Sequence, residues 1–304
     1  MNLHIILITF LRVALGATFI FSGVIKLYPI EPFELNFIDI GLADWITASI
    51  LARLLISLEI FLGVMLIINF FTRTVLLLTI ALLMLFSIYL LWAMYAHGDQ
   101  GNCGCFGTFL EMTPMESLYK NSAMLLVAVF LYKMNKPFYW KYARITTCII
   151  AMSSISFSYI INPPDFLASS NMDIENVGYK LDTKYLGDYN FSGQKPDFSK
   201  GKHILAFFLT TCPHCKLTAL KLSVLKRKYA LPPVYAVIAG KEKKLAEFLS
   251  ESKWDLPYYY YTNKDLLKLS GPDFPAIFYI KDGIVTAKWN NLMMNEQDIQ
   301  AVLK

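Results

Sequence analysis

The sequence predicts an α-helical membrane bundle followed by a separate α/β domain. Of the 304 residues, 56% are hydrophobic and only 17% are charged, whereas a typical soluble domain is about 25% charged. The apolar residues are concentrated before about Ile161, and the rest of the chain has the composition of a soluble domain. The formal net charge of +5 comes from scattered lysines, without the dense basic patch of nucleic-acid-binding proteins. We therefore expect a lipid bilayer, and no nucleic acid, around the first half.

Five apolar stretches are long enough to cross a bilayer, which takes about 20 residues per helix. They are Leu3–Tyr28, Ile46–Phe70, Thr74–Ala96, Met115–Met134 and Ala143–Ile161. The first stretch is longer than the apolar core of a signal peptide, and further stretches follow it, so we expect it to remain as an uncleaved helix. The first four stretches predict a four-helix domain over residues 1–135, and the last predicts a fifth spanning helix within 136–165.

Lysine and arginine in the short loops predict the orientation, because cytoplasmic loops carry an excess of both. One set of loops carries Arg73, Lys133, Lys136, Lys141 and Arg144. The opposite loops carry Glu31, Glu34, Asp39, Asp44, Asp99 and Glu111. This pattern favours a bacterial inner-membrane protein with a cytoplasmic N-terminus. Everything after Ile161 is then expected on the periplasmic side.

Four ionisable residues fall within or at the end of the predicted spans: Arg12, Lys26, Arg53 and Glu59. A charge in lipid is costly, so such residues usually face the bundle interior and pair. One hypothesis is a polar site for a quinone, or for proton transfer, beneath the loop that follows the third span. The alternative is structural. Arg12 and Glu59 lie at similar depth and would pair, while Lys26 would reach out to the interface.

Two cysteines, Cys103 and Cys105, lie in the glycine-rich loop between the third and fourth spans. A Cys-Gly-Cys disulfide closes a very small ring, so its geometry departs from the relaxed bridge and it should be easily reduced. This favours a relay pair over a structural crosslink. A zinc site would need two more ligands, and only His97 is near in the sequence. We expect no metal.

The first half resembles the MauE/DoxX family of redox-associated membrane proteins over roughly residues 1–135. The resemblance is carried by Ser22-Gly23, Lys26, Glu59 and the CGCFG loop at residues 103–107. It implies support of disulfide formation, or electron transfer to extracytoplasmic thiols. The four-helix arrangement is also similar to that of vitamin K epoxide reductase. The chain departs from that pattern, however, because it lacks a second cysteine pair within the helices, which argues against direct quinone reduction.

The second half carries a cysteine motif at the start of a helix. A linker is expected over 166–200, followed by a domain over 201–304. A buried-strand pattern over His203–Leu209 leads into Cys212-Pro213-His214-Cys215 and then a helical pattern. A helix N-terminus favours the thiolate of the first cysteine, and His214 would add positive charge. This arrangement resembles the thioredoxin active site, in which Cys212 would be the nucleophile and Cys215 the resolving thiol. A zinc knuckle would need a second close cysteine pair, which this half lacks.

The remaining pattern completes a thioredoxin-like order of strands and helices. Strands are expected over 234–239, 257–262, 276–280 and 284–289, and helices over 241–252, 263–270 and from about Asn295. The extra strand and helix are similar to those of TlpA-like members. By position in that superfamily, Pro275 is expected to follow a cis peptide bond. The run Tyr258–Tyr261 predicts a strand with alternating buried and exposed rings, and a partner-binding patch is the alternative.

These features together predict a membrane-bound thiol–disulfide oxidoreductase. A client protein would exchange a disulfide with Cys212/Cys215, which would exchange in turn with Cys103/Cys105. The membrane domain would then react with an external carrier, for which a quinone is the one cofactor considered. The direction of electron flow is open, because oxidation and reduction of clients use the same residues. A non-enzymatic assembly or client-binding factor built on a thioredoxin fold is the alternative. Cys148, alone in the fifth span, is interpreted as a packed residue.

Overall fold

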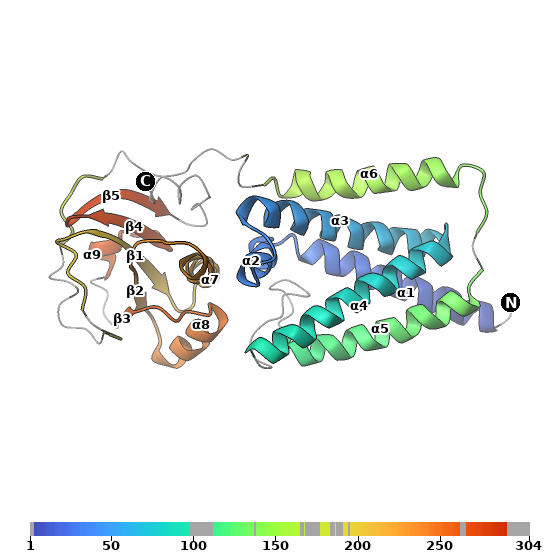
Figure 1. The fold of residues 1–304 in the computed structure, drawn as a ribbon, viewed down its shortest axis with the longest axis horizontal. Helices are drawn as coiled ribbons and strands as arrows, with labels where there is room; N and C mark the ends of the chain where they lie inside the picture. Colours follow the sequence, from blue (N-terminus) through green and yellow to red (C-terminus); the bar gives the residue numbers. More distant parts are fainter. Residues whose placement is uncertain are drawn as a thin grey trace. The chain divides into compact units, whose positions relative to one another are not determined.

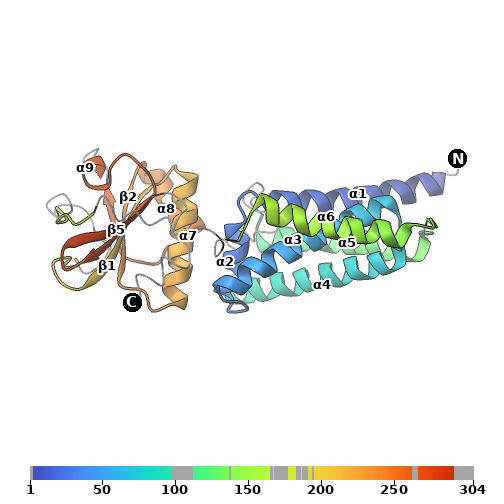
Figure 2. The same ribbon diagram turned by 90° about the horizontal axis from the view of Figure 1, so that it is seen from above.

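The computed structural model describes residues 3–97, 112–136, 138–164, 167, 177–182, 186, 191–193, 195–261 and 266–290. The chain divides into two compact units (Figures 1 and 2). One comprises Met1–Asn36 with Ile46–Pro164, and the other comprises Phe37–Trp45 with Asp165–Lys304. The Cys103/Cys105 loop and the helix expected from Asn295 lie outside the described residues.

Helices build the first unit, and the five expected apolar stretches each form one (Figure 1). The long helices are α1 (Leu3–Ile25), α3 (Trp45–Ile68), α4 (Thr72–His97), α5 (Pro114–Met134) and α6 (Ala143–Ile161). A short helix, α2 (Glu31–Asp39), lies between α1 and α3, where the sequence predicted only an acidic loop. Pro32 in its first turn suits a helix start, because the proline ring already holds the helical φ angle.

Within the described residues, α1, α3, α4 and α6 are long and apolar enough to cross a membrane by length and composition. Helix α5 carries Glu116, Lys120 and Lys133 and does not qualify in this way. Its 21 residues nevertheless give it a length of about 30 Å, and it packs against α4 and α1. Its start is fixed by a capping box, in which Thr113 accepts from the Glu116 N–H and Glu116 accepts from the Thr113 N–H. The predicted helical membrane bundle is therefore confirmed, with α5 held in it by packing.

Small residues bring α1 and α3 into close contact. A Cβ atom added at Gly16 would lie 2.6 Å from the Gly63 carbonyl oxygen, and one at Gly63 would lie 2.6 Å from the Gly16 carbonyl oxygen. Such spacing lets two backbones approach without intervening side chains, as in small-residue interfaces of membrane helices. The contact sets the distance between the two helices that carry the buried charges.

A mixed five-stranded sheet forms the core of the second unit (Figure 1). Its strands are β1 (Lys202–Leu209), β2 (Val234–Ala239), β3 (Tyr258–Tyr261), β4 (Ala276–Lys281) and β5 (Ile284–Asn290). The order is β3-β2-β1-β4-β5, in which β1, β2 and β3 are parallel to one another, β4 is antiparallel to β1, and β5 is antiparallel to β4. This order and these directions confirm the predicted thioredoxin-like arrangement.

Helices cover both faces of this sheet (Figures 1 and 2). Helices α7 (Pro213–Lys228) and α8 (Leu245–Glu251), with the short 3-10 turn η3 (Glu242–Lys244), lie on one face, and α9 (Leu266–Ser270) lies on the other. On the α8 face, the Phe208 ring packs 5.8 Å from that of Phe248 and 5.5 Å from that of Trp254, between ring centroids. In β3, Tyr259 and Tyr261 are buried, and the other two tyrosines of the strand are half-buried. The expected alternation is confirmed.

Parts of the expected linker pack along both edges of the sheet. On the β5 edge, Gly178 N–H donates to the Val285 carbonyl at 2.8 Å, and Leu181 N–H donates to the Gly283 carbonyl at 2.9 Å. On the β3 edge, Ser192 N–H donates to the Tyr258 carbonyl at 3.0 Å. Leu181, Leu186 and Phe198 are buried in the core of the domain. These segments therefore belong to the folded domain.

Candidate redox site

The Cys212 and Cys215 side chains occupy the first turn of α7. The chain leaves β1 at Leu209 and turns, with the Cys212 N–H donating to the Leu209 carbonyl at 3.1 Å. Cys212 is the N-cap of α7, and Pro213 begins the helix. The Cys212 sulfur accepts a hydrogen bond from the Cys215 N–H at 3.2 Å. An N–H donor at a helix start stabilises negative charge on the sulfur that accepts from it.

The two thiols differ strongly in exposure. Cys212 is partly exposed, whereas Cys215 is fully buried. Burial raises the pKa of the Cys215 thiol, and its hydrogen bond with Cys212 raises it further. Cys215 is therefore held as a neutral thiol while Cys212 is accessible. These environments fit the predicted roles, with Cys212 attacking and Cys215 resolving.

The charged side chains around the motif lie on the solvent side. His214, predicted to add positive charge, is exposed in the first turn of α7. Lys216, the residue after the buried thiol, forms ion pairs with Glu251 and Glu247 of α8. Both carboxylates anchor Lys216 toward α8, which ties the start of α7 to its neighbouring helix.

Pro275 is the residue for which the sequence predicted a cis peptide bond. The Phe274–Pro275 peptide bond is cis, as expected. Pro275 immediately precedes β4, in which Ala276 pairs with Phe207 of β1. The proline therefore meets the end of the strand that leads into the cysteine motif.

The structure gives less information about the other three cysteines, Cys103, Cys105 and Cys148. Cys103 and Cys105 lie outside the described residues, but the helix ends that flank their loop can be placed. His97 ends α4 and Pro114 begins α5 at the same end of the bundle as α2 and the end of α6 (Figure 1). Cys148 is exposed on α6, so the expected packing within the bundle is wrong. In the described part of the chain, no group of three His, Cys, Asp or Glu side chains is arranged to hold a metal.

Lys26 and Glu59 form a buried ion pair inside the bundle. The Lys26 Nζ atom lies 2.5 Å from Glu59 Oε1, and both residues are 2% exposed. The rings of Phe33 and Phe86 lie beside the ammonium, each with its centroid 5.1 Å from Nζ. Lys26 therefore points into the bundle, and the expectation that it reaches the membrane interface is wrong.

Arg12 does not meet Glu59, contrary to the expected pairing. Its guanidinium donates to the carbonyls of Leu66 and Ile67 at the end of α3, the second at 2.8 Å. Glu59 lies seven residues earlier than Leu66 on the same helix, about 10 Å along its axis. The prediction paired Arg12 with Glu59 because both lie near the middle of their apolar stretches. Depth alone does not tell how each helix is rotated about its axis or shifted along it. Arg12 instead satisfies carbonyl groups that the helix end leaves without partners.

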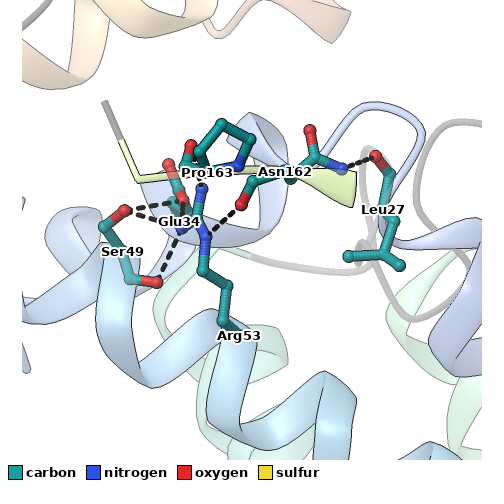
Figure 3. Close-up of polar contacts among 6 residues, drawn as sticks. All are labelled: Leu27, Glu34, Ser49, Arg53, Asn162 and Pro163. Atoms are coloured by element: carbon teal, nitrogen blue, oxygen red, sulfur yellow. Dashed lines mark hydrogen bonds and ion pairs between the residues drawn. The ribbon is translucent and has the colours of Figure 1, made fainter. Parts of the chain in front are cut away.

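Arg53 is the centre of a polar cluster that joins α2, α3 and the end of α6 (Figure 3). It is 1% exposed and pairs with Glu34 of α2. Its Nε donates to the Asn162 carbonyl at 2.6 Å and its Nη2 to the Pro163 carbonyl at 3.0 Å. Nη1 donates to the backbone and side-chain oxygens of Ser49 at 2.7 and 2.6 Å.

The same cluster reaches the turn that follows α1, because the Asn162 amide donates to the Leu27 carbonyl at 2.7 Å (Figure 3). Sequence reasoning missed Glu34, Ser49 and Asn162 as partners. Asn162 had a usable signal, since it ends the last apolar stretch and precedes two prolines. The four charged residues singled out from the sequence thus fall into three groups of contacts, those of Arg12, those of Arg53 and the Lys26–Glu59 pair.

Comparison with known proteins agrees with the two halves. Residues 4–134 match the family described as methylamine utilisation protein MauE, which confirms the resemblance expected over 1–135. The chain is 25% identical to Protein TlpB of Flavobacterium psychrophilum over 353 aligned residues, covering 96% of this chain and 94% of that protein. The similarity to TlpB therefore includes both the bundle and the thioredoxin-like domain.

Solved structures resemble the thioredoxin-like part. A secreted Mycobacterium tuberculosis disulfide oxidoreductase homologous to E. coli DsbE is 13% identical, with a TM-score of 0.29, over 34% of this chain and 78% of its own. A Chlorobium tepidum thiol:disulfide interchange protein DsbE is 20% identical, with a TM-score of 0.29, over 35% and 78%. The thioredoxin domain of a Bacteroides vulgatus thiol-disulfide oxidoreductase is 16% identical, with a TM-score of 0.31, over 45% and 93%. These scores are low, so the fold assignment rests on the strand order described above.

Proposed function

We propose that the chain is a membrane-bound protein thiol–disulfide oxidoreductase. The observation that carries the proposal is the asymmetric cysteine pair at the start of α7. An accessible Cys212 sulfur accepts the N–H of a buried Cys215 at 3.2 Å. This is the arrangement that an attacking thiolate and a protected resolving thiol require.

In the reducing direction, the Cys212 thiolate attacks a client disulfide. A new S–S bond forms between Cys212 and one client sulfur, and the other client sulfur leaves as a thiolate that takes up a proton. Cys215 then loses its proton and attacks Cys212, which releases the reduced client and leaves a Cys212–Cys215 disulfide. In the oxidising direction the same steps run backwards. The high pKa of buried Cys215 favours the mixed disulfide over premature resolution, which gives the client time to bind.

The membrane half supplies the second part of the proposed relay. Cys103/Cys105 exchange with Cys212/Cys215, and the membrane domain then exchanges electrons with an external carrier of the quinone class. The match to the MauE family and the similarity to TlpB support joining the two halves in one function. We place the protein in the bacterial inner membrane with its N-terminus in the cytoplasm. The thioredoxin-like domain and its thiol clients then lie on the periplasmic side.

Trapping in cells tests the proposal. Replacing Cys215 with alanine removes the resolving thiol, so mixed disulfides through Cys212 should accumulate on acid quenching and appear on non-reducing gels. We expect adducts with client proteins and an internal Cys212 adduct with Cys103 or Cys105. The C212A/C215A variant is the matched control and should give none of these adducts.

The redox state of the wild-type pair, read by alkylation in the same cells, gives the direction. A mostly oxidised pair indicates a client oxidase, and a mostly reduced pair indicates a client reductase. If C215A forms no adduct and the C212S/C215S variant retains the cellular function, the relay is wrong. The chain is then a client-binding or assembly factor.

A further inference from the structure

One end of the bundle, where α3 and α5 end and α4 and α6 begin, carries positive charge that no acidic residue balances (Figure 1). The sequence has no Asp or Glu between Glu59 and Asp99, nor between Glu116 and Asp165. Among the described residues, no acidic side chain forms an ion pair with any of the cations at this end. The exposed cationic side chains at this end are Arg73, Lys133, Lys136, Lys141 and Arg144.

Helix stability gives no reason for the two arginines. Arg73 and Arg144 lie in the first turns of α4 and α6, where the positive end of the helix dipole disfavours a cation. The excess of lysine and arginine in cytoplasmic loops accounts for the number of cations. Such a signal for membrane orientation requires no fixed structure in the loops that carry it.

The connection between α5 and α6 is, however, held in place by the turn between α3 and α4. Asn69 has a left-handed φ of 70°, which asparagine tolerates better than most residues, and its carbonyl accepts the Phe138 N–H at 3.0 Å. Its side-chain amide donates to the Lys136 carbonyl at 3.0 Å, and its side-chain oxygen accepts from the Asn135 amide at 2.7 Å. Thr72 Oγ1 donates to the same oxygen at 2.7 Å. The two loops therefore form one hydrogen-bonded surface.

Aromatic rings are exposed on the same surface. Phe138 and Trp140 stack on Phe70, with ring centroids 5.9 and 5.6 Å apart. Tyr142 meets Trp140 edge-on, with ring centroids 5.7 Å apart. Phe138, Trp140 and Tyr142 remain between 45% and 57% exposed, and Tyr139 is 89% exposed. Tryptophan and tyrosine rings favour the headgroup level of a bilayer, so this surface suits the membrane interface.

We propose that this surface binds the headgroups of anionic phospholipids. The cations neutralise the phosphate, and Lys141 is held beside a ring, with its Nζ atom 4.7 Å from the Tyr142 centroid. The exposed rings pack against the glycerol and the first methylene groups of the lipid. A free phosphate would use the cations and leave the rings without a partner, which favours a lipid as the occupant.

The proposed orientation places this surface at the cytoplasmic leaflet, where anionic lipids attract clustered lysine and arginine. The inference is independent of the proposed relay, because no cysteine takes part in it.

Native mass spectrometry of the full chain in detergent tests the proposal. The probes are phosphatidylglycerol, which is anionic, and phosphatidylcholine, which has no net charge, with identical acyl chains. We expect the wild type to bind phosphatidylglycerol more tightly. K141Q/R144Q should bind it roughly 25-fold more weakly, at about fivefold for each cation, with phosphatidylcholine binding unchanged. K241Q/K243Q removes two exposed lysines from the other unit. It is the matched control and should bind like the wild type.

Two further measurements identify what the surface recognises. K141R/R144K keeps both charges, so it should bind phosphatidylglycerol nearly as tightly as the wild type. Potassium phosphate should displace no more phosphatidylglycerol than potassium chloride of the same ionic strength. Stronger displacement by phosphate would contradict a lipid site and indicate a site for free phosphate.

Thermal unfolding separates lost binding from lost structure. K141Q/R144Q removes a cation from the start of α6, so without added lipid it should unfold at a temperature no lower than the wild type does. Phosphatidylglycerol should raise the unfolding temperature of the wild type more than that of this variant, because a ligand of the folded state stabilises it. If the double variant does not fold, Arg73→Gln on α4 replaces it and should weaken binding about fivefold.

Equal binding of the two lipids by the wild type overturns the proposal. Unchanged phosphatidylglycerol binding by a folded K141Q/R144Q variant does so as well. In either case the cations serve only as a signal for membrane orientation.

Discussion

At the scale of single residues, the protein places two chemically identical thiols in different environments. Because Cys215 is buried and its pKa is raised, it should resist alkylation even at mildly alkaline pH. Brief treatment of the reduced protein with iodoacetamide should label Cys212 at least ~100-fold faster than Cys215, since the thiolate is the nucleophile. Mass spectrometry of the peptide that carries both residues measures this ratio. Equal labelling of the two thiols in the folded protein would contradict the assigned roles.

The raised pKa of Cys215 also predicts a pH dependence of stability. In the unfolded chain a cysteine ionises near about pH 8.5, whereas the folded protein keeps this thiol protonated at higher pH. The folded state therefore binds more protons above that pH, and its stability should fall as the pH rises. Thermal unfolding of the reduced wild type should show this loss, and C215A should show less of it. An identical pH profile for the two proteins would exclude Cys215 as the cause.

Arg53 offers the sharpest test of the buried polar cluster. Arg53→Ala leaves Glu34 without its cation and two carbonyls without their donor, which should cost about 3–5 kcal/mol. Arg53→Lys keeps the charge but loses the planar fork that reaches several acceptors at once, so it should be intermediate. Thermal unfolding in detergent measures both. R53A/E34Q should recover part of the loss, and no recovery would mean that the carbonyl contacts dominate.

Residues whose role depends on local sequence were predictable, and residues whose role depends on helix packing were not. The spacing of Cys212 and Cys215 after a strand fixed their place at a helix start, and Pro275 followed from its position before a hairpin. The partners of Arg12 and Glu59 could not be predicted in the same way. They depend on the rotation and offset of α1 and α3, which are set by contacts such as that between Gly16 and Gly63.

At the scale of secondary-structure elements, the α1–α3 contact makes an unusual prediction for a helix interior. Glycine-to-alanine changes there normally stabilise by roughly 1 kcal/mol. At Gly16 the new methyl group would lie 2.6 Å from a backbone oxygen of α3, so the helices must separate. We expect Gly16→Ala to destabilise by about 1–3 kcal/mol, measured by thermal unfolding in detergent. Ala17→Val, on the exposed side of α1, should have little effect.

Long apolar runs and alternating apolar patterns predicted helices and strands correctly. The short helix α2 and the segments that pack along the sheet edges have much weaker sequence patterns. Helix α2 is only 9 residues long, and its charged residues favoured a loop. The segments around Gly178 and Ser192 pair with the sheet through isolated backbone hydrogen bonds, which leave no periodic pattern of side chains. Their apolar members, Leu181, Leu186 and Phe198, are too widely spaced to indicate a strand or a helix.

At the scale of the whole molecule, the sheet of the second unit is joined to the end of α6 by a connection shorter than the expected linker. Arg53 holds Pro163 at the end of the bundle, and Gly178 is hydrogen-bonded to β5. Residues 164–177 between them span at most about 50 Å when fully extended. The connection therefore limits how far the Cys212/Cys215 pair can travel from the bundle.

This limit makes the proposed relay sensitive to the length of the connection. A Gly-Ser segment of equal length, inserted between Pro164 and Val177, should lower the effective concentration of one cysteine pair at the other by roughly 3-fold. The rate of the internal C215A adduct measures the change. Reaction of the same variant with glutathione disulfide is the control and should be unaltered. An unchanged internal rate would show that exchange is limited by chemistry and not by encounter.

The docked segments at the two edges of the sheet have a consequence for client selection. An open edge strand can recruit an extended peptide by β-augmentation, with backbone bonds supplying affinity. Here the start of β5 and the start of β3 are already bonded to the chain's own residues near Gly178 and Ser192. A client is then left with the exposed surface around Cys212. Because a client can make few backbone contacts with the domain, we expect recognition to depend little on client sequence and mostly on whether a client cysteine is accessible. Such a domain would act on many different client proteins.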